Sequence, residues 1–245
     1  MFFLRVISFF FLIFSILLKF QIISLEIYTG IDRYLLNASI ILFSFSVILP
    51  LISAIKFKSM NTEKNDYISQ IFSEININKS VDIYVTKSSL IKAAGVLYRG
   101  NKPTIIINQL LLNTLTFEQL KFVLAHEYCH IQKQHLIKNI LSLIFVLSGI
   151  PILLLILSSY FIKISSLIIV LSFSVVIYIG LIIVHFIFSQ RREYIADKYA
   201  MKIVGLKTSK ETLKSLKKQN LISERSYTIF ETHPSLKKRL ENLSI

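Results

Sequence analysis

Cysteine and acidic residues are scarce in this sequence. Cys129 is the one cysteine among 245 residues, which excludes an internal disulfide and a metal cluster of several thiolates and suits a reducing compartment. Asp and Glu total 14 against 28 Lys and Arg, so the formal net charge is +14. No zinc-finger, recognition-helix or stacking-aromatic pattern accompanies this charge, so we expect no nucleic-acid partner. Orientation in an anionic membrane explains the charge more simply.

Charged residues are also missing from long apolar runs. Residues 140–162 and 165–188 contain no Asp, Glu, Lys or Arg, and two further apolar blocks cover residues 2–25 and 35–55. Each block is close to the ~20 residues that cross a hydrocarbon core. Hydrophobic residues make up 53% of the chain, and its mean hydropathy is +0.62. We therefore predict a mainly α-helical integral membrane protein with four transmembrane helices in a lipid bilayer.

The charges around these blocks predict how the chain is oriented. Arg5 precedes the first block as in a signal peptide, but no Ala-x-Ala cleavage site follows, so we predict an uncleaved anchor. Arg33 and Lys163 are the basic residues of the two short connections between blocks. Segments 56–138 and 189–245 contain most of the other basic residues. By the positive-inside rule, both long segments face the cytoplasm. We expect a multi-pass protein of a bacterial cell membrane.

The two polar segments are expected to form a single domain. Segment 56–138 has only about 80 residues and can bury only a modest core, so it should fold together with segment 189–245. An N-terminal transmembrane hairpin (1–55) precedes the first polar segment, and a second hairpin (139–188) separates the two.

Within the polar domain, local patterns predict helices and a small sheet. Val81–Val85 and Thr104–Ile107 are rich in β-branched residues and are predicted to be strands. Thr116 followed by Gln119 is a capping box, which predicts a helix over Phe117–His135. A second capping box predicts a tail helix, with Thr208 and Glu211 opening residues 209–219.

The predicted helix carries the run His126-Glu127-Tyr128-Cys129-His130. Residues four apart on a helix differ by ~40° around its axis, so both imidazoles project from one face at a separation that one Zn²⁺ can bridge. Glu127 lies beside them, where its carboxylate can take a proton from a water molecule at the metal. This pattern predicts a catalytic zinc site.

A catalytic zinc normally has three protein ligands and one open position, so a third ligand is needed. A metzincin would have Gly at position 133 and His at position 136, but the chain has Lys133 and Leu136. Glu193 and Asp197 follow the last apolar block and are four residues apart, so they share a helical face. Glu193 can ligate zinc, and Asp197 can accept the remaining N–H of a zinc-bound histidine.

Two other histidines lie near these motifs. His135 is ~180° from His126 if the helix continues that far, so we predict a solvated surface side chain that points away from the metal. His233 suits two roles, as a donor to an oxyanion or, together with Pro234, as a residue at a helix start.

The motifs together resemble the HtpX-like membrane metallopeptidases, relatives of the CAAX prenyl endopeptidases. The resemblance covers roughly residues 80–245, with Leu124-Ala125-His126-Glu127-Tyr128-Cys129-His130, then Arg192-Glu193-Tyr194-Ile195-Ala196-Asp197 with Ala200, then Thr232-His233-Pro234-Ser235 with Arg239 and Leu240. It implies a gluzincin-type zinc peptidase with one Zn²⁺ per chain. The implied metal ligands are His126, His130 and Glu193, and the implied general base is Glu127.

The resemblance also implies a substrate class, namely misfolded or damaged membrane proteins that are degraded for quality control. Strand Thr104–Ile107 is predicted to be the edge on which an extended substrate pairs. Two positions depart from the family pattern. Residues 92–96 are Lys-Ala-Ala-Gly-Val, where HtpX-like sequences usually have Asn-Ala-Phe-Ala before a Gly. Cys129 stands before the second histidine of the motif, where the family commonly has Gly.

Two other functions are compatible with an H-E-x-x-H run between membrane helices. A membrane-bound metalloprotease-type sensor or signal transducer would need an extracytoplasmic sensor domain, and the outer connections are too short for one. A non-catalytic, zinc-stabilised scaffold would need a fourth protein ligand, and apart from His135, which is predicted to point away from the metal, no further Cys or His lies near the motif in the sequence.

Overall fold

The computed structural model describes residues 2–19, 57–75, 81–99, 102–143, 164–222 and 233–244, with single positions between 36 and 55 and residue 146. The chain divides into two compact units. Unit 1 comprises Met1–Leu51 and Asn139–His185, and unit 2 comprises Ile52–Lys138 and Phe186–Ile245. Because the sites discussed below lie in unit 2, unit 1 is described only briefly.

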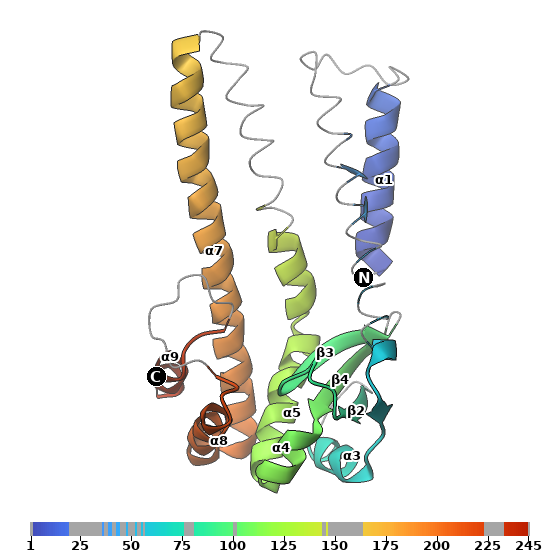
Figure 1. Cartoon of the computed structure of the whole chain (residues 1–245), viewed down its shortest axis with the longest axis vertical. Helices are drawn as coiled ribbons and strands as arrows, with labels where there is room; N and C mark the ends of the chain where they lie inside the picture. The colour runs from blue at the N-terminus through green and yellow to red at the C-terminus, as the bar shows by residue number, and fades with distance from the viewer. Residues whose placement is uncertain are drawn as a thin grey trace. The chain divides into compact units, whose positions relative to one another are not determined.

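Unit 1 contains helix α1 (Phe2–Lys19) and the first part of helix α7 (Ile164–Val204; Figure 1). Helix α7 has 41 residues, and at 1.5 Å per residue it is about 62 Å long, roughly twice a membrane span. Among the described residues, only its segment Val175–Val204 is long and apolar enough to cross a membrane. The predicted spans over 35–55 and 140–162 lie largely outside the described residues, so the number of four spans stays a prediction.

Unit 2 contains a four-stranded sheet with the strand order β1-β2-β4-β3. Strands β2 and β4 are parallel, and the pairs β1–β2 and β3–β4 are antiparallel. The strands are β1 (Thr62–Glu63), β2 (Asp82–Thr86), β3 (Ala94–Arg99) and β4 (Lys102–Asn108). Strands β2 and β4 confirm the two that the β-branched runs predict.

The edge of this sheet is not where the sequence placed it. The predicted edge, Thr104–Ile107, lies in β4, which is paired on one side with β2 and on the other with β3. That prediction is wrong, because β-branched content marks a buried strand without telling which neighbours it has. Strand β3, which carries the only glycine of the sheet, Gly95, is the edge strand beyond β4.

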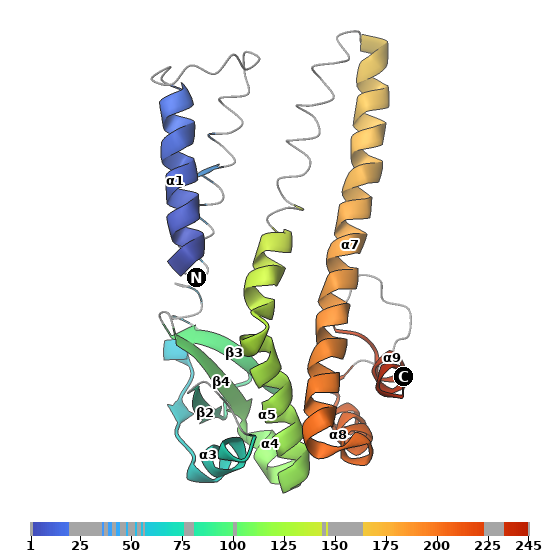
Figure 2. The same cartoon turned by 180° about the vertical axis from the view of Figure 1, so that it is seen from behind.

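One apolar core joins the sheet to the helices of unit 2. In β4, the side chains of Ile105 and Ile107 belong to this core and that of Ile106 to a smaller cluster, as expected for alternate sides of a strand. Helix α5 contacts β3, β4, α3 and α8, and α8 contacts α9 (Figures 1 and 2). The helices are α3 (Asp66–Ser73), α4 (Gln109–Thr114), α5 (Phe117–Gln132), α8 (Leu206–Lys218) and α9 (Leu236–Leu243).

Helix α5 begins where its capping box predicts. The Thr116 side chain accepts from the backbone N–H of Gln119, and the Gln119 side chain accepts from the backbone N–H of Thr116. Its end differs from the prediction, because the helix stops at Gln132 rather than at His135. Gln134 has a φ of 54°, a left-handed conformation that interrupts a helix, and residues 135–143 are helical again.

The second predicted capping box is wrong. Helix α8 begins at Leu206, and no side chain caps its start. Gly205, with a φ of 85°, is the single residue between α7 and α8. Its positive φ, which glycine adopts without strain, sets the break between the two helices. Thr208 therefore lies inside the first turn, where its carbonyl oxygen accepts a bond from the Thr212 hydroxyl at 2.7 Å.

Candidate metal centre

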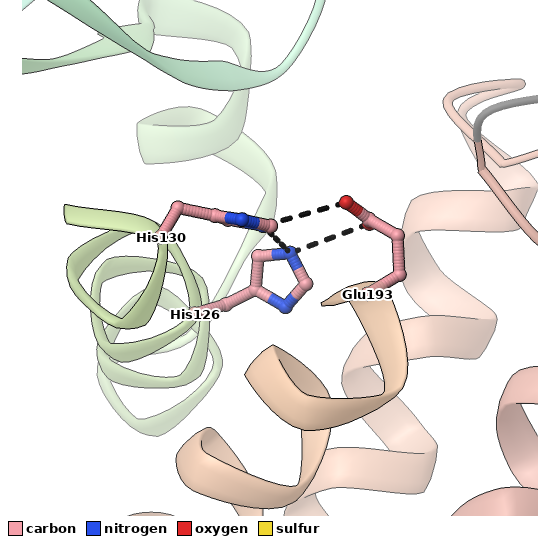
Figure 3. Close-up of side chains that lie close together, drawn as sticks. All are labelled: His126, His130 and Glu193. Carbon is pink, nitrogen blue, oxygen red and sulfur yellow. Dashed lines mark hydrogen bonds and ion pairs between the residues drawn. The ribbon is translucent and has the colours of Figure 1, made fainter. Parts of the chain in front are cut away.

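The side chains of His126 and His130 project from the same face of α5, as their spacing predicts. Their Nε2 atoms lie 3.1 Å apart, and their ring centroids are 4.8 Å apart. The rings face α7, and the His126 side chain is buried (Figure 3). Two ring nitrogens therefore converge on one point between the two helices.

Glu193 on α7 completes this cluster. Its Oε2 lies 3.6 Å from His126 Nε2, and its Oε1 lies 3.4 Å from His130 Nε2 (Figure 3). One ligand atom from each of the three residues lies within 4.8 Å of the other two, so the group could hold a metal ion. The structure thus brings together the three residues that the sequence nominates as ligands, across a separation of more than sixty residues in the chain.

The spacing of these atoms fits a small tetrahedral metal ion. Zinc binds imidazole nitrogen and carboxylate oxygen at about 2.0–2.2 Å, which places two ligand atoms of a tetrahedron roughly 3.3–3.5 Å apart. The two histidine nitrogens are 3.1 Å apart, and the nearest carboxylate oxygen of Glu193 is 3.6 Å from one (Oε2 to His126) and 3.4 Å from the other (Oε1 to His130), so these separations lie around that value. Two imidazoles and a carboxylate are also a donor set that zinc enzymes use.

Behind the cluster, Asp197 holds the first histidine in place. Its Oδ1 lies 3.0 Å from His126 Nδ1, the ring nitrogen that faces away from Glu193. The Arg239 guanidinium of α9 donates to both Asp197 oxygens, with Nε at 2.7 Å from Oδ2. Asp197 and Arg239 are only 1% and 6% exposed, so this pair is a buried, bidentate one. The C-terminal helix thereby contacts the metal centre through one carboxylate.

The electrostatics of the two histidines differ. Burial lowers the pKa of His126, but the carboxylates of Asp197 and Glu193 outweigh this effect and raise the pKa to about 10. For His130, burial and the positive charge of His126 lower the pKa to about 3. The carboxylates of Asp197 and Glu193 thus favour positive charge on His126, whereas a second positive charge on His130 is disfavoured.

His135 does not lie where the sequence predicts. Its side chain is buried, with 3% exposed, and its Nδ1 lies 2.9 Å from His130 Nδ1. The predicted solvated surface position assumes a helix that continues through residue 135. Because Gln134 is left-handed, the chain turns there and the 100° rule no longer applies.

Glu127 lines the same cavity as two of the clustered residues, His126 and Glu193. The cavity has a volume of about 720 Å³, and His126, Glu127 and Glu193 line its polar side. Burial is the main cause that raises the pKa of the Glu127 carboxyl. A raised pKa makes a carboxylate a stronger base, which suits a group that accepts a proton near neutral pH.

The rest of the cavity wall is largely apolar. Strand β3 and the segment before it form one side, and helices α5 and α8 with the residues after α8 form another. The apolar lining includes Leu90, Ile91, Val96, Leu111, Phe122, Val123, Leu216, Leu221 and Ile222. An apolar trough beside a cluster of polar groups has the form of a binding site for a peptide.

His233 also reaches the cluster. Its Nδ1 lies 3.0 Å from Glu193 Oε2, and its side chain is 73% exposed. The hydrogen bond to the Glu193 carboxylate raises the pKa of His233. Helix α9 begins at Leu236 after Ser235 at its N-cap, so His233 precedes the helix and does not cap it. His233 lies two residues before the N-cap Ser235, and both of its suggested roles stay predictions.

Sequence patterns alone missed two contributors to this site. Arg239 appears in the family motif without a role, because no local signal shows that its partner is Asp197, 42 residues away. Strand β3 lacks a run of β-branched residues, so it was not predicted as a strand. The Gly-Asn pair at positions 100 and 101, directly before the β-branched run of β4, was the available signal for a hairpin.

Comparisons with known proteins are consistent with this geometry. Residues 59–245 match the sequence profile of "Peptidase family M48". The crystal structure of S. mikatae Ste24p matches the fold with a TM-score of 0.58 at 18% sequence identity, over 87% of this chain and 58% of that one. The chain therefore spans well under two thirds of the length of Ste24p. A comparison with curated proteins gives no match. Since the profile covers most of its length, the chain belongs to peptidase family M48, the metallopeptidase family of HtpX and the CAAX proteases.

Proposed function

We propose that this chain is a zinc-dependent endopeptidase of a membrane, with His126, His130 and Glu193 as metal ligands and Glu127 as general base. The observation that carries the proposal is that one ligand atom each of His126, His130 and Glu193 lies within 4.8 Å of the others, beside the cavity that Glu127 lines together with His126 and Glu193. The test is peptide cleavage by the parent and Glu127→Gln proteins, with bound zinc measured in both.

The residues divide the chemistry between them. Zinc bound by the three ligands would act as a Lewis acid that lowers the pKa of water and polarises the peptide carbonyl. Glu127 takes a proton from the attacking water and passes it to the leaving amine. Asp197 holds the His126 ring with its Nε2 toward the cluster. His233, exposed beside Glu193, is placed to donate a hydrogen bond to the carbonyl oxygen as it becomes negative.

The open cavity favours an enzyme over a scaffold. A structural zinc site is closed by four protein ligands, whereas a catalytic site keeps a position open. Among the described residues, the candidate group contains three ligands and borders a cavity of about 720 Å³. Within the part of the chain that the structure describes, the group thus has three ligands, and the cavity beside it can hold water and substrate.

Strand β3 is the edge on which we propose that an extended substrate pairs. Asn108 N–H donates to Ala93 O at 2.7 Å, and in the β3–β4 register these two residues are opposite each other. Bonded and non-bonded pairs alternate in an antiparallel ladder, so Gly95 points its backbone groups toward β4. The N–H and C=O groups of Ala94 and Val96 then face the open edge, beside the cavity. A peptide paired there would be read through its main chain, with little sequence preference.

A proline at this edge tests the pairing. Val96→Pro removes one N–H that faces the open edge and leaves the bonds from β3 to β4 intact, a position that tolerates proline. One hydrogen bond contributes about 0.5–1.5 kcal/mol, so we expect kcat/KM for an extended peptide to fall roughly 2- to 12-fold relative to Val96→Ala. The Val96→Ala protein keeps the N–H and controls for lost packing. Equal kcat/KM in the two variants would exclude pairing at Val96.

Helix α7 supports a location at a membrane. Glu193 is in the same continuous helix as the apolar segment that can cross a membrane, so the metal centre is tied to a bilayer by the element that carries one of its ligands. We propose four spans, a peptidase domain on the cytoplasmic side, and misfolded or damaged membrane proteins as substrates. A site beside a membrane helix that binds substrates through main-chain hydrogen bonds would accept proteins of varied sequence.

Cysteine labelling tests this orientation. In a Cys129→Ala background, single cysteines replace Ser59, Lys163 and Lys210 in cells that express the protein. We expect a membrane-impermeant thiol reagent to label position 163 in intact cells and to label positions 59 and 210 only after lysis, because the basic segments stay inside. Labelling of position 59 or 210 from outside would show that the domain faces the other way.

A further inference from the structure

We propose that His135 is a positioning residue for the metal site, where it accepts a hydrogen bond from His130 Nδ1–H and so directs His130 Nε2 at the metal. This inference rests on the proposed role of His130 as a ligand. The His135 ring lies behind His130, on the side opposite Glu193, and is therefore not a further ligand in the cluster of His126, His130 and Glu193.

The contact between the two rings assigns the proton. His130 Nδ1 and His135 Nδ1 lie 2.9 Å apart, with ring planes at 72° and centroids 4.9 Å apart. At this distance one nitrogen carries a hydrogen and the other offers a lone pair. A metal on Nε2 of His130 needs the lone pair there, so the hydrogen of His130 is on Nδ1. His135 is then the acceptor through Nδ1 and carries its own hydrogen on Nε2.

The two histidine ligands would thus be held by partners of different charge. The ring of His126 faces the carboxylate of Asp197, which is itself paired with Arg239. The ring of His130 faces a second imidazole. Carboxylates and carbonyls are the usual partners of a metal-bound histidine, and either one fixes the tautomer and the ring orientation. A neutral imidazole does the same without adding a negative charge behind the metal.

The backbone is shaped to bring His135 to this position. Helix α5 ends at Gln132, and Gln134 adopts a φ of 54°, a left-handed conformation that residues other than glycine rarely adopt. The Gln134 N–H donates to Ile131 O at 3.2 Å, and the Lys138 N–H donates to Gln134 O at 3.1 Å as the next helical segment starts. A straight helix would carry residue 135 to the opposite side of α5 from His126. The left-handed residue is therefore what returns His135 to His130.

Two substitutions separate an accepted hydrogen bond from packing alone. His135→Asn places an amide oxygen close to where the ring has Nδ1, so it can still accept from His130. His135→Leu fills the buried position but accepts nothing. Gln132→Leu, at an exposed position on the last turn of α5, is the matched control for adding an apolar side chain near the site.

The measurement is the affinity of the full-length protein in detergent for Zn²⁺ and Co²⁺, by competition with a chelator, and the visible absorption spectrum of the Co²⁺ form. We expect His135→Leu to bind both metals about 10- to 100-fold more weakly than the parent protein and to alter the Co²⁺ spectrum. His135→Asn should stay within about 3-fold of the parent and keep its spectrum, since the acceptor is retained. Thermal unfolding of each metal-free protein reports any loss of stability separately.

Other outcomes would overturn the inference. Parent-like affinity and spectrum in His135→Leu would mean that the contact does not orient His130. Equal losses in His135→Asn and His135→Leu would mean that the ring fills space and is not needed as an acceptor. If the parent protein itself binds neither metal, the proposed metal centre fails and the role of His135 fails with it. That result is distinct from the first two, in which the parent binds and only the variants decide.

Discussion

The Glu127→Gln protein is expected to retain zinc and its fold but to lose peptide cleavage by at least about 100-fold, because general-base catalysis typically contributes 10²–10⁴. Glutamine has nearly the shape of glutamate and leaves the three candidate ligands untouched, but it cannot accept a proton. Burial raises the pKa of Glu127, so an uncharged amide should fit the site without loss of stability.

The measurement for this variant is kcat/KM on a peptide or an unfolded membrane protein, with zinc determined by elemental analysis of the same sample. Glu118→Gln is the matched control, since Glu118 lies on the same helix at an exposed position and should leave both values unchanged. Cleavage by Glu127→Gln within about tenfold of the parent would show that another group removes the proton.

The Glu193→Ala protein is expected to show no detectable cleavage and a severe loss of zinc. Two imidazoles with Nε2 atoms 3.1 Å apart would remain, but two protein ligands hold zinc poorly compared with the three of a catalytic site. The partners of Glu193 would also be left without their carboxylate, including His233 at 3.0 Å. Zinc content after dialysis and kcat/KM are the measurements, and Glu241→Ala, at an exposed site on α9, is the control.

A substitution at Asp197 gives the comparison that identifies the ligand. Asp197→Asn keeps the shape of the side chain and an oxygen for Arg239, so it avoids leaving that buried cation without any partner. We expect zinc affinity to fall only about 10- to 100-fold, as is typical when the partner of a ligating histidine is weakened. If Asp197→Asn removes the metal while Glu193→Ala keeps zinc and cleavage, the two carboxylates have been assigned the wrong way round.

Parts of the fold were predictable because their signals are local. The start of α5 follows from the reciprocal bonds of Thr116 and Gln119, three residues apart. Strands β2 and β4 follow from their β-branched residues. The pairing of His126 with His130 follows from the helical repeat, because residues four apart share a face of any helix.

Other parts depend on how distant segments pack. Gln134 adopts a left-handed conformation although it is not a glycine, so the sequence did not indicate a turn there. Because of this turn, His135 contacts His130 in the interior instead of lying at the surface as predicted. The start of α8 is set by Gly205 after a helix of 41 residues, so the capping box of Thr208 was not used. Local preferences yield where a neighbouring element already fixes the backbone.

The sequence by itself determined which chemical groups are available. It showed a helix with His126, Glu127 and His130, an acidic pair that shares another helical face, and long apolar runs. Only the tertiary structure decided which groups meet. In the folded chain, carboxylate oxygens of Glu193 lie 3.4–3.6 Å from the two histidines, and Arg239 pairs with Asp197 behind His126. The edge strand of the sheet is β3 and not β4. The physical reason is that periodicity and capping act over a few residues, whereas contacts between α5, α7, α9 and the sheet are selected by the burial of a shared core.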